Sequence, residues 1–186
     1  MSSWFETCVH VLRHSLAIIG ALVVAGVVGG VIFMYSGVFN VAATVVDSSV
    51  VNWALVTVRE ASIGLHARDV AAPLKTMTAD RDAGFQIYRR KCVMCHTPIG
   101  RRPQPMAVGF NPQAPGFGPG ADDMSGTELF WVTKNGIRFT GMPAWGPSLS
   151  DKEIWEITAF VMALPEMTAA DYDAIDARIP EGAAMR

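Results

Sequence analysis

The sequence predicts an all-α protein in which one membrane-spanning helix and a second, amphipathic helix precede a small helical domain. Three observations support this prediction: a long uncharged apolar run, apolar residues with helical spacing further along the chain, and Ser-x-x-Glu capping boxes at two helix starts. We divide the chain into an N-terminal segment on the cytoplasmic side (1–14), a transmembrane anchor (15–36), a juxtamembrane segment (37–77), a helical domain (78–168) and an acidic tail (169–186).

The apolar run at residues 15–36 carries no charge and is long enough to cross a bilayer as a helix. A cleaved signal peptide is the alternative, because the Val-Ala-Ala at residues 41–43 is a fair cleavage site. The run exceeds the roughly 7–15 apolar residues of a signal peptide, which favours a retained anchor. Arg13 precedes the run and no other Lys or Arg follows until Arg59, which favours an N-terminus on the inner side of the membrane.

A second helix is expected near residues 49–68, after the candidate N-caps Asp47, Ser48 and Ser49. Its apolar residues recur with helical period at Val50, Trp53, Ala54, Val58, Ala61 and Leu65. The segment is too polar to cross the membrane again. Two interpretations stay open: a spacer helix packed on the domain, or a helix that lies on the membrane or on a partner subunit.

Three helices are expected in the domain. Their bounds are 79–92, then the capping box of Ser125 and Glu128 to Gly136, then the capping box of Ser150 and Glu153 to about Leu164. Residues 97–124 contain six prolines and no helical period. A loop of this length is unusual in a compact domain, and we expect a cofactor to supply the missing core. The acidic residues Asp171, Asp173, Asp176 and Glu181 indicate a tail that is mobile or bound to a partner.

The segment Cys92-Val93-Met94-Cys95-His96 is typical of a covalent attachment site for c-type haem. Two thiols three positions apart can add to the two vinyl groups of a haem, and the following His96 can then bind the iron. The alternatives are a redox-active cysteine pair or half of a zinc site. Zinc would need more ligands, and the one remaining cysteine is the distant Cys8. A thioredoxin-like pair would lie in a βαβ pattern that the sequence lacks.

Met142 is the best candidate for the second axial ligand of the iron. It is flanked by Gly141, which lets the backbone come close to a haem, and by Pro143, which stiffens the loop. Weaker candidates are Met106 and Met124 in the proline-rich loop and His66 before the domain. Met162 and Met167 are interpreted as packing residues.

These motifs together resemble a monohaem class I cytochrome c of bacterial type over residues 78–166. The segments that carry the resemblance are Gly84 to Tyr88, Cys92 to His96, Asn135 to Arg138 and Thr140 to Pro143. Upstream, Tyr35 to Gly37 and Asn40 to Ala43 look like membrane-anchored proteobacterial members of this group. The resemblance implies one covalent haem c, attached outside the cytoplasmic membrane. It also implies a helix crossing in which Gly84 and Tyr88 meet Ile157 and Phe160.

The expected function is that of an electron-transfer protein and not of an enzyme. A haem with both axial positions filled by His96 and Met142 leaves no position for a substrate. We expect a single-pass protein of the bacterial inner membrane with its haem domain in the periplasm. Its partners would be membrane lipid and a redox complex of a respiratory chain, with neither nucleic acid nor a small-molecule substrate. The alternatives are a haem enzyme or gas or peroxide sensor with a displaceable Met142, and a structural haem subunit.

Basic residues cluster around the two ligand segments, at Arg89, Arg90, Lys91, Arg101, Arg102, Lys134 and Arg138. They are either ordinary solvated charges or a ring that meets an acidic patch on a partner. The acidic tail is expected to compete for the same surface.

Overall fold

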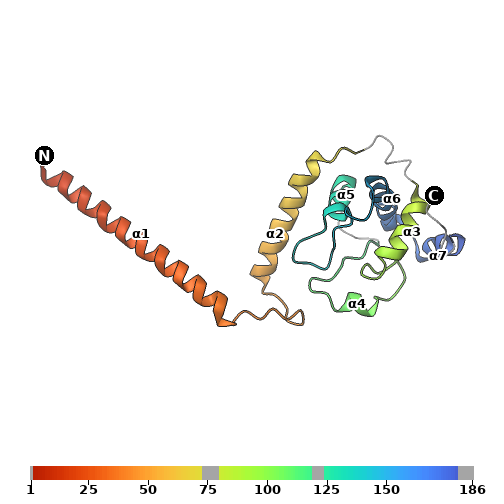
Figure 1. The fold of residues 1–186 in the computed structure, drawn as a ribbon, viewed down its shortest axis with the longest axis horizontal. Coiled ribbons are helices and arrows are strands. Elements are labelled where there is room, and N and C mark those ends of the chain that lie inside the picture. Colours follow the sequence, from red (N-terminus) through yellow and green to blue (C-terminus); the bar gives the residue numbers. More distant parts are fainter. Residues whose placement is uncertain (1, 73–79, 119–123, 180–186) are drawn as a thin grey trace. The chain divides into compact units, whose positions relative to one another are not determined.

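The computed structural model describes residues 2–72, 80–118 and 124–179, and over these residues it is helical without strands, as predicted. The chain forms two compact units, residues 1–45 and 46–186. Each is described by itself below, and Figure 1 labels their helices.

The first unit is dominated by α1 (Ser2–Ser36), a single continuous helix. The stretch Trp4–Ser36 has a mean hydropathy of 2.7 in its most apolar window, and none of that window is buried within the protein. Its length and composition are sufficient to cross a membrane, and they also occur in signal sequences near an N-terminus. The helix starts well before residue 15, the first residue of the predicted anchor. Glu6, His10 and Arg13 interrupt the apolar run in this first part but not the helix.

The second unit begins with α2 (Ser49–His66), followed by the 3₁₀ turn η1 (Ala67–Asp69). The Ser48 side chain caps α2 by accepting a hydrogen bond from the Val51 amide, so the predicted helix near 49–68 is confirmed. Ile63 and Ala67 are buried where α2 and η1 pack against α5 (Gly126–Asn135). The rest of α2 is much more exposed.

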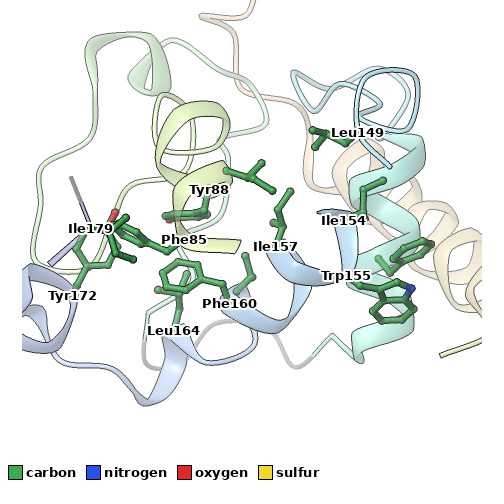
Figure 2. Close-up of a cluster of buried hydrophobic side chains, with 13 residues drawn as sticks. Phe85, Tyr88, Leu149, Ile154, Trp155, Ile157, Phe160, Leu164, Tyr172 and Ile179 are labelled. Atoms are coloured by element: carbon green, nitrogen blue, oxygen red, sulfur yellow. The ribbon is translucent and has the colours of Figure 1, made fainter. Parts of the chain in front are cut away.

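Helices α3 (Arg81–Lys91) and α6 (Asp151–Val161) form the centre of the domain. Gly84 allows their close approach, since a Cβ atom there would clash with the carbonyl oxygen of Glu156 and lie 3.1 Å from the Cβ atom of Phe160. The rings of Phe85 and Tyr88 both pack on Phe160, with centroid distances of 5.3 and 5.2 Å (Figure 2). The crossing that the resemblance implied is therefore present.

Helices α5 and α6 both begin at the predicted capping boxes, in which Ser125 pairs with Glu128 and Ser150 pairs with Glu153. Each serine side chain accepts from the glutamate amide, while the glutamate carboxylate accepts from the serine amide. Helix α5 ends at Gly136, whose φ of 68° suits glycine. The rings of Phe130 on α5 and Trp155 on α6 stack at 4.3 Å and join these two helices.

Two helices were not expected from the sequence. The first is α4 (Pro105–Val108), a single turn within the proline-rich loop. The second is α7 (Ala169–Arg178), which follows the 3₁₀ turn η3 (Leu164–Glu166) and lies in the segment interpreted as a tail. Tyr172 of α7 is buried and packs edge-on against Phe85, with ring centroids 5.5 Å apart. The first part of the acidic segment is thus packed on the domain, while Glu181 lies outside the described residues.

Candidate haem site

The Cys92–His96 segment is a tight turn at the C-terminal end of α3. Cys92 is the C-cap of this helix, and its amide donates to the Tyr88 carbonyl at 2.8 Å. The amides of Cys95 and His96 in turn donate to the Cys92 carbonyl at 3.0 and 2.7 Å. The packed helix α3 therefore fixes the backbone of both cysteines, which are half-buried.

The surroundings of Cys92 do not suit a redox-active thiol. Burial, with a smaller contribution from the nearby Cys95, raises the pKa of Cys92 to about 12. Redox-active cysteine pairs have a lowered thiol pKa, because the thiolate is the reacting form. Among the residues that the structure describes, no three or more His, Cys, Asp or Glu side chains are grouped so that they could hold a metal ion. The zinc interpretation therefore has no support in this part of the chain.

The His96 ring is held by two residues of the proline-rich loop. Its Nδ1 atom lies 2.8 Å from the carbonyl oxygen of Pro115, and its face stacks on Phe117 at a centroid distance of 4.6 Å and an angle of 21°. Because a carbonyl oxygen only accepts hydrogen bonds, Nδ1 must carry the proton, which leaves the lone pair on Nε2. Burial lowers the pKa of His96, against an opposing effect of the Pro115 hydrogen bond. The ring is thus held in the neutral form and tautomer that bind a metal through Nε2.

The backbone of Met142 is held at both its polar groups. Its amide donates to the Thr140 hydroxyl at 3.1 Å, and its carbonyl accepts from the Ile137 amide at 3.2 Å. Gly136 adds a second constraint, because a Cβ atom there would lie only 2.8 Å from the Met142 carbonyl oxygen. The side chain of Met142 is half-buried. Gly136 thus ends α5, as predicted, and also leaves room for the Met142 loop.

Two contacts tie the attachment segment and the proline-rich loop to the Met142 loop. The Nζ atom of Lys91, which precedes Cys92, lies 5.0 Å from the ring centroid of Trp145. Phe110 of the proline-rich loop packs on Gly141, where a Cβ atom would come within 2.8 Å of its ring. The two predicted ligand segments are therefore connected through their neighbours.

The weaker ligand candidates lie in different surroundings. Met106 is on α4 and exposed, and Met124 is half-buried just before α5. The His66 side chain bonds the Ser62 carbonyl of its own helix and lies beside Trp131 on α5.

Two buried polar atoms near the attachment segment have no hydrogen-bond partner among the described residues, the Tyr88 hydroxyl and the Gln86 Oε1 atom. Burial raises the pKa of Tyr88 above its usual value, so the hydroxyl stays protonated and can donate. Buried polar groups in native proteins are almost always paired. The Tyr88 hydroxyl lies one helical turn before Cys92 and lacks an acceptor among the described residues. A polar group of a bound cofactor could accept its hydrogen bond.

Most of the basic cluster is engaged within the domain. Arg101 pairs with Asp173 at 2.6 Å and Arg89 with Asp176 at 2.9 Å, both acidic partners belonging to α7. Lys134 pairs with Asp151 at 2.6 Å. Arg90, Arg102 and Arg138 are exposed. The acidic segment thus meets the basic surface, as expected, through α7.

Comparison with known proteins identifies the domain that carries these residues. Residues 79–161 match the family model of cytochrome c oxidase, cbb3-type, subunit III. A solved structure, the reducing HAO-like protein complex Kustc0457/Kustc0458 of Kuenenia stuttgartiensis, is 26% identical, with 52% of this chain and 46% of that chain covered and a TM-score of 0.37. The chain thus spans less than half the length of that relative. A search of curated proteins found no match. On the strength of the family match and the Cys92–His96 motif, the chain contains a c-type cytochrome domain, of a family that holds haem c covalently and transfers electrons.

Proposed function

We propose that the chain is a membrane-tethered electron carrier with one haem c, attached through Cys92 and Cys95 and ligated by His96 and Met142. Bound haem c would supply an iron centre that changes its charge by a single electron. The observation that carries the proposal is the arrangement of His96, whose Nδ1 donates to Pro115 and whose ring stacks on Phe117. This arrangement leaves Nε2 free to serve as the proximal ligand.

The role of the protein is to hold both ligands in place. Two ligands that keep their positions when the iron changes its oxidation state suit one-electron transfer, because the transfer then requires little structural rearrangement. His96 is restrained at its ring, and Met142 at its amide and carbonyl. Met142 as a sixth ligand would also close the iron to substrates, which separates a carrier from a haem enzyme.

The location follows from α1. We propose that α1 anchors the protein in the bacterial inner membrane, with the cytochrome domain on the periplasmic side. In this position the domain would carry electrons between a quinol- or substrate-oxidising complex and a terminal acceptor. The matched family is named for an oxidase subunit, which supports assembly into a redox complex, either as a tethered shuttle or as a fixed subunit.

Spectroscopy and turnover of the purified full chain test this proposal. The pyridine haemochrome assay should give one haem per chain, and the ferric protein should be low-spin, with the weak band at the red end of the visible range that marks iron–thioether bonding. Membranes from the source organism should reduce and reoxidise it reversibly. High-spin ferric haem that reacts with peroxide or nitric oxide would favour the enzyme or sensor instead. Low-spin haem that exchanges no electrons with the membranes would indicate a structural subunit.

A further inference from the structure

Helix α2 exposes an unusually apolar face. Four of its large apolar side chains on one side of the helix are between 57% and 69% exposed: Val50, Leu55, Val58 and Leu65. Helical geometry places Val50, Val58 and Leu65 within roughly 80° of one another around the axis. Ile63, by contrast, is only 6% exposed and lies roughly 140° from Val58 around that axis, on the side that packs against the domain. The exposed apolar face of α2 is therefore a feature distinct from the contact with α5.

We propose that this face of α2 lies in the interfacial layer of the lipid bilayer, with the helix axis along the membrane surface. The inference rests on the proposed membrane anchor, because the anchor is what brings α2 to the bilayer. The inference goes beyond the anchor, because it assigns membrane contact to a second helix. This helix, α2, belongs to the second unit and does not cross the membrane.

The chain that leads into α2 supports the bilayer as the occupant. Residues 37–48 connect α1 to α2 and reach at most about 40 Å when fully extended, so α2 begins within that distance of the end of the proposed span. This connection is itself apolar and exposed, with Val38 at 77%, Val41 at 87% and Val46 at 90%. Apolar surface thus continues along the sequence from α1 into α2, whereas a face made for a separate protein would not need an apolar approach.

The charges of α2 also support contact with the bilayer, and they indicate which kind of lipid it can accept. The helix carries one basic and one acidic residue, Arg59 and Glu60, and these pair with each other at 3.2 Å. No charged residue of the helix therefore has to be desolvated without a partner. Interfacial helices that recognise anionic lipid carry Lys or Arg on the polar face. Since α2 has none in excess, its contact with lipid should be driven by apolar burial and be independent of headgroup charge.

The contact has a consequence for the cytochrome domain. The C-terminal part of α2 packs on α5 through Ile63, and the His66 ring lies 5.5 Å from the ring of Trp131. A helix held flat on the membrane would therefore restrain the orientation of the whole domain, and with it the direction in which the haem edge faces.

Site-directed spin labelling of the full holoprotein tests the inference. In a Cys8→Ser background, a nitroxide is attached at Val58→Cys, at Asn52→Cys on a different face of the same helix, or at Val23→Cys in α1. The protein is placed in nanodiscs of uncharged phosphatidylcholine, one chain per disc. Collision with oxygen, which concentrates in lipid, is compared with collision with a water-soluble nickel chelate.

The label at Val58 should favour oxygen over the chelate severalfold more than the label at Asn52, and should approach the value at Val23. Adding anionic lipid or salt should leave this ratio unchanged. A chelate-accessible label at Val58 with a lipid-exposed label at Val23 would overturn the inference while leaving the anchor intact. Protection of Val58 from both reagents would show that protein covers the face, which also overturns it. A water-exposed label at Val23 would refute the anchor, and the inference would fall with it.

Discussion

Backbone and side-chain groups together position the two proposed haem ligands, His96 and Met142. Pro115 orients the His96 ring through its carbonyl oxygen, while Thr140 and Ile137 restrain Met142. The Pro115 carbonyl cannot be removed by point substitution, whereas the stacked ring of Phe117 and the Thr140 hydroxyl can. Part of the restraint on each residue therefore depends on a side chain.

Met142→Ala should leave the haem attached, because in our proposal attachment depends on Cys92 and Cys95, but should open the sixth position or lower the reduction potential. The measurement is the ferric visible spectrum together with a redox titration. Met106→Ala is the matched control, since Met106 is an exposed methionine of α4, and it should leave both unchanged. A low-spin spectrum that keeps the thioether band after Met142→Ala would identify another methionine as the ligand.

At the scale of helices, the α3–α6 crossing is set by the absence of one side chain. Gly84→Ala would place a Cβ atom against the Glu156 carbonyl, a backbone atom that can move only if α6 moves. We expect a loss of about 2–4 kcal/mol in the free energy of unfolding, somewhat above the usual cost of overpacking. Gly116→Ala is the control, because nothing lies within 4 Å of a Cβ atom there. Chemical denaturation of the two holoproteins measures the difference, and equal stabilities would show that the helices do not cross this closely.

The capping boxes should make the helices sensitive to acid. The hydroxyl and the amide of Ser150 lower the pKa of Glu153, as Ser125 lowers the pKa of Glu128 and Thr168 that of Asp171. A carboxylate with a lowered pKa in the folded state stabilises that state above its ordinary pKa, and the contribution is lost as pH falls through the folded value.

Glu153→Gln should therefore lower the unfolding temperature at pH 7, and this difference from the unchanged protein should shrink as pH falls below about 4. Circular dichroism at 222 nm follows the transition, and the visible spectrum recorded in parallel shows whether the haem ligands have changed. Glu166→Gln serves as control, since Glu166 is an exposed residue of η3. A difference that stays constant from pH 7 to pH 3 would mean that the charge of Glu153 does not matter.

The sequence predicted those helices whose ends carry strong local signals. The serine boxes located the starts of α5 and α6, and Gly136 located the end of α5. Helix α7 also has a capping box, Thr168 with Asp171, but its acidic composition resembles a solvated tail. What holds it is the long-range packing of Tyr172 on Phe85, which no local pattern reveals.

In the candidate site, too, the local sequence motifs could be predicted, whereas the contacts between distant segments could not. The motif at Cys92–His96 and the loop at Met142 are local patterns and can be recognised from spacing alone. The stacking of Phe117 on His96 joins segments separated by an irregular loop, so the spacing of residues gives no indication of it. The ligand assignments themselves stay predictions until the spectra are measured.

For the whole molecule, the separation into two compact units has a direct test. Replacing residues 1–45 by a cleavable export signal should give a cytochrome with the spectrum of the full chain, because the buried core lies entirely in the second unit. The measurement compares visible spectra and haem content after confirmed export. Exported protein that lacks haem would show that the first unit takes part in folding.

Partner docking is also a property of the whole surface. Because Arg101 is paired with Asp173, reversing its charge would disturb α7 as well as any docking contact. The better test is Arg102→Glu combined with Arg138→Glu, both exposed positions. We expect the rate of electron transfer to a membrane partner to fall as ionic strength rises, and this double substitution to flatten the dependence. A rate indifferent to salt in the unchanged protein would point to an apolar or permanent contact.

Cys92 is both the C-cap of α3 and, as we propose, one of two anchors of the cofactor. In the folded domain its thiol is half-buried at the end of a packed helix, and burial raises its pKa, which disfavours the reactive thiolate. Thioether bonds would therefore form more readily on a nascent, open chain than after α3 has packed on α6. This favours an order of assembly in which the cofactor is attached first and the domain folds around it.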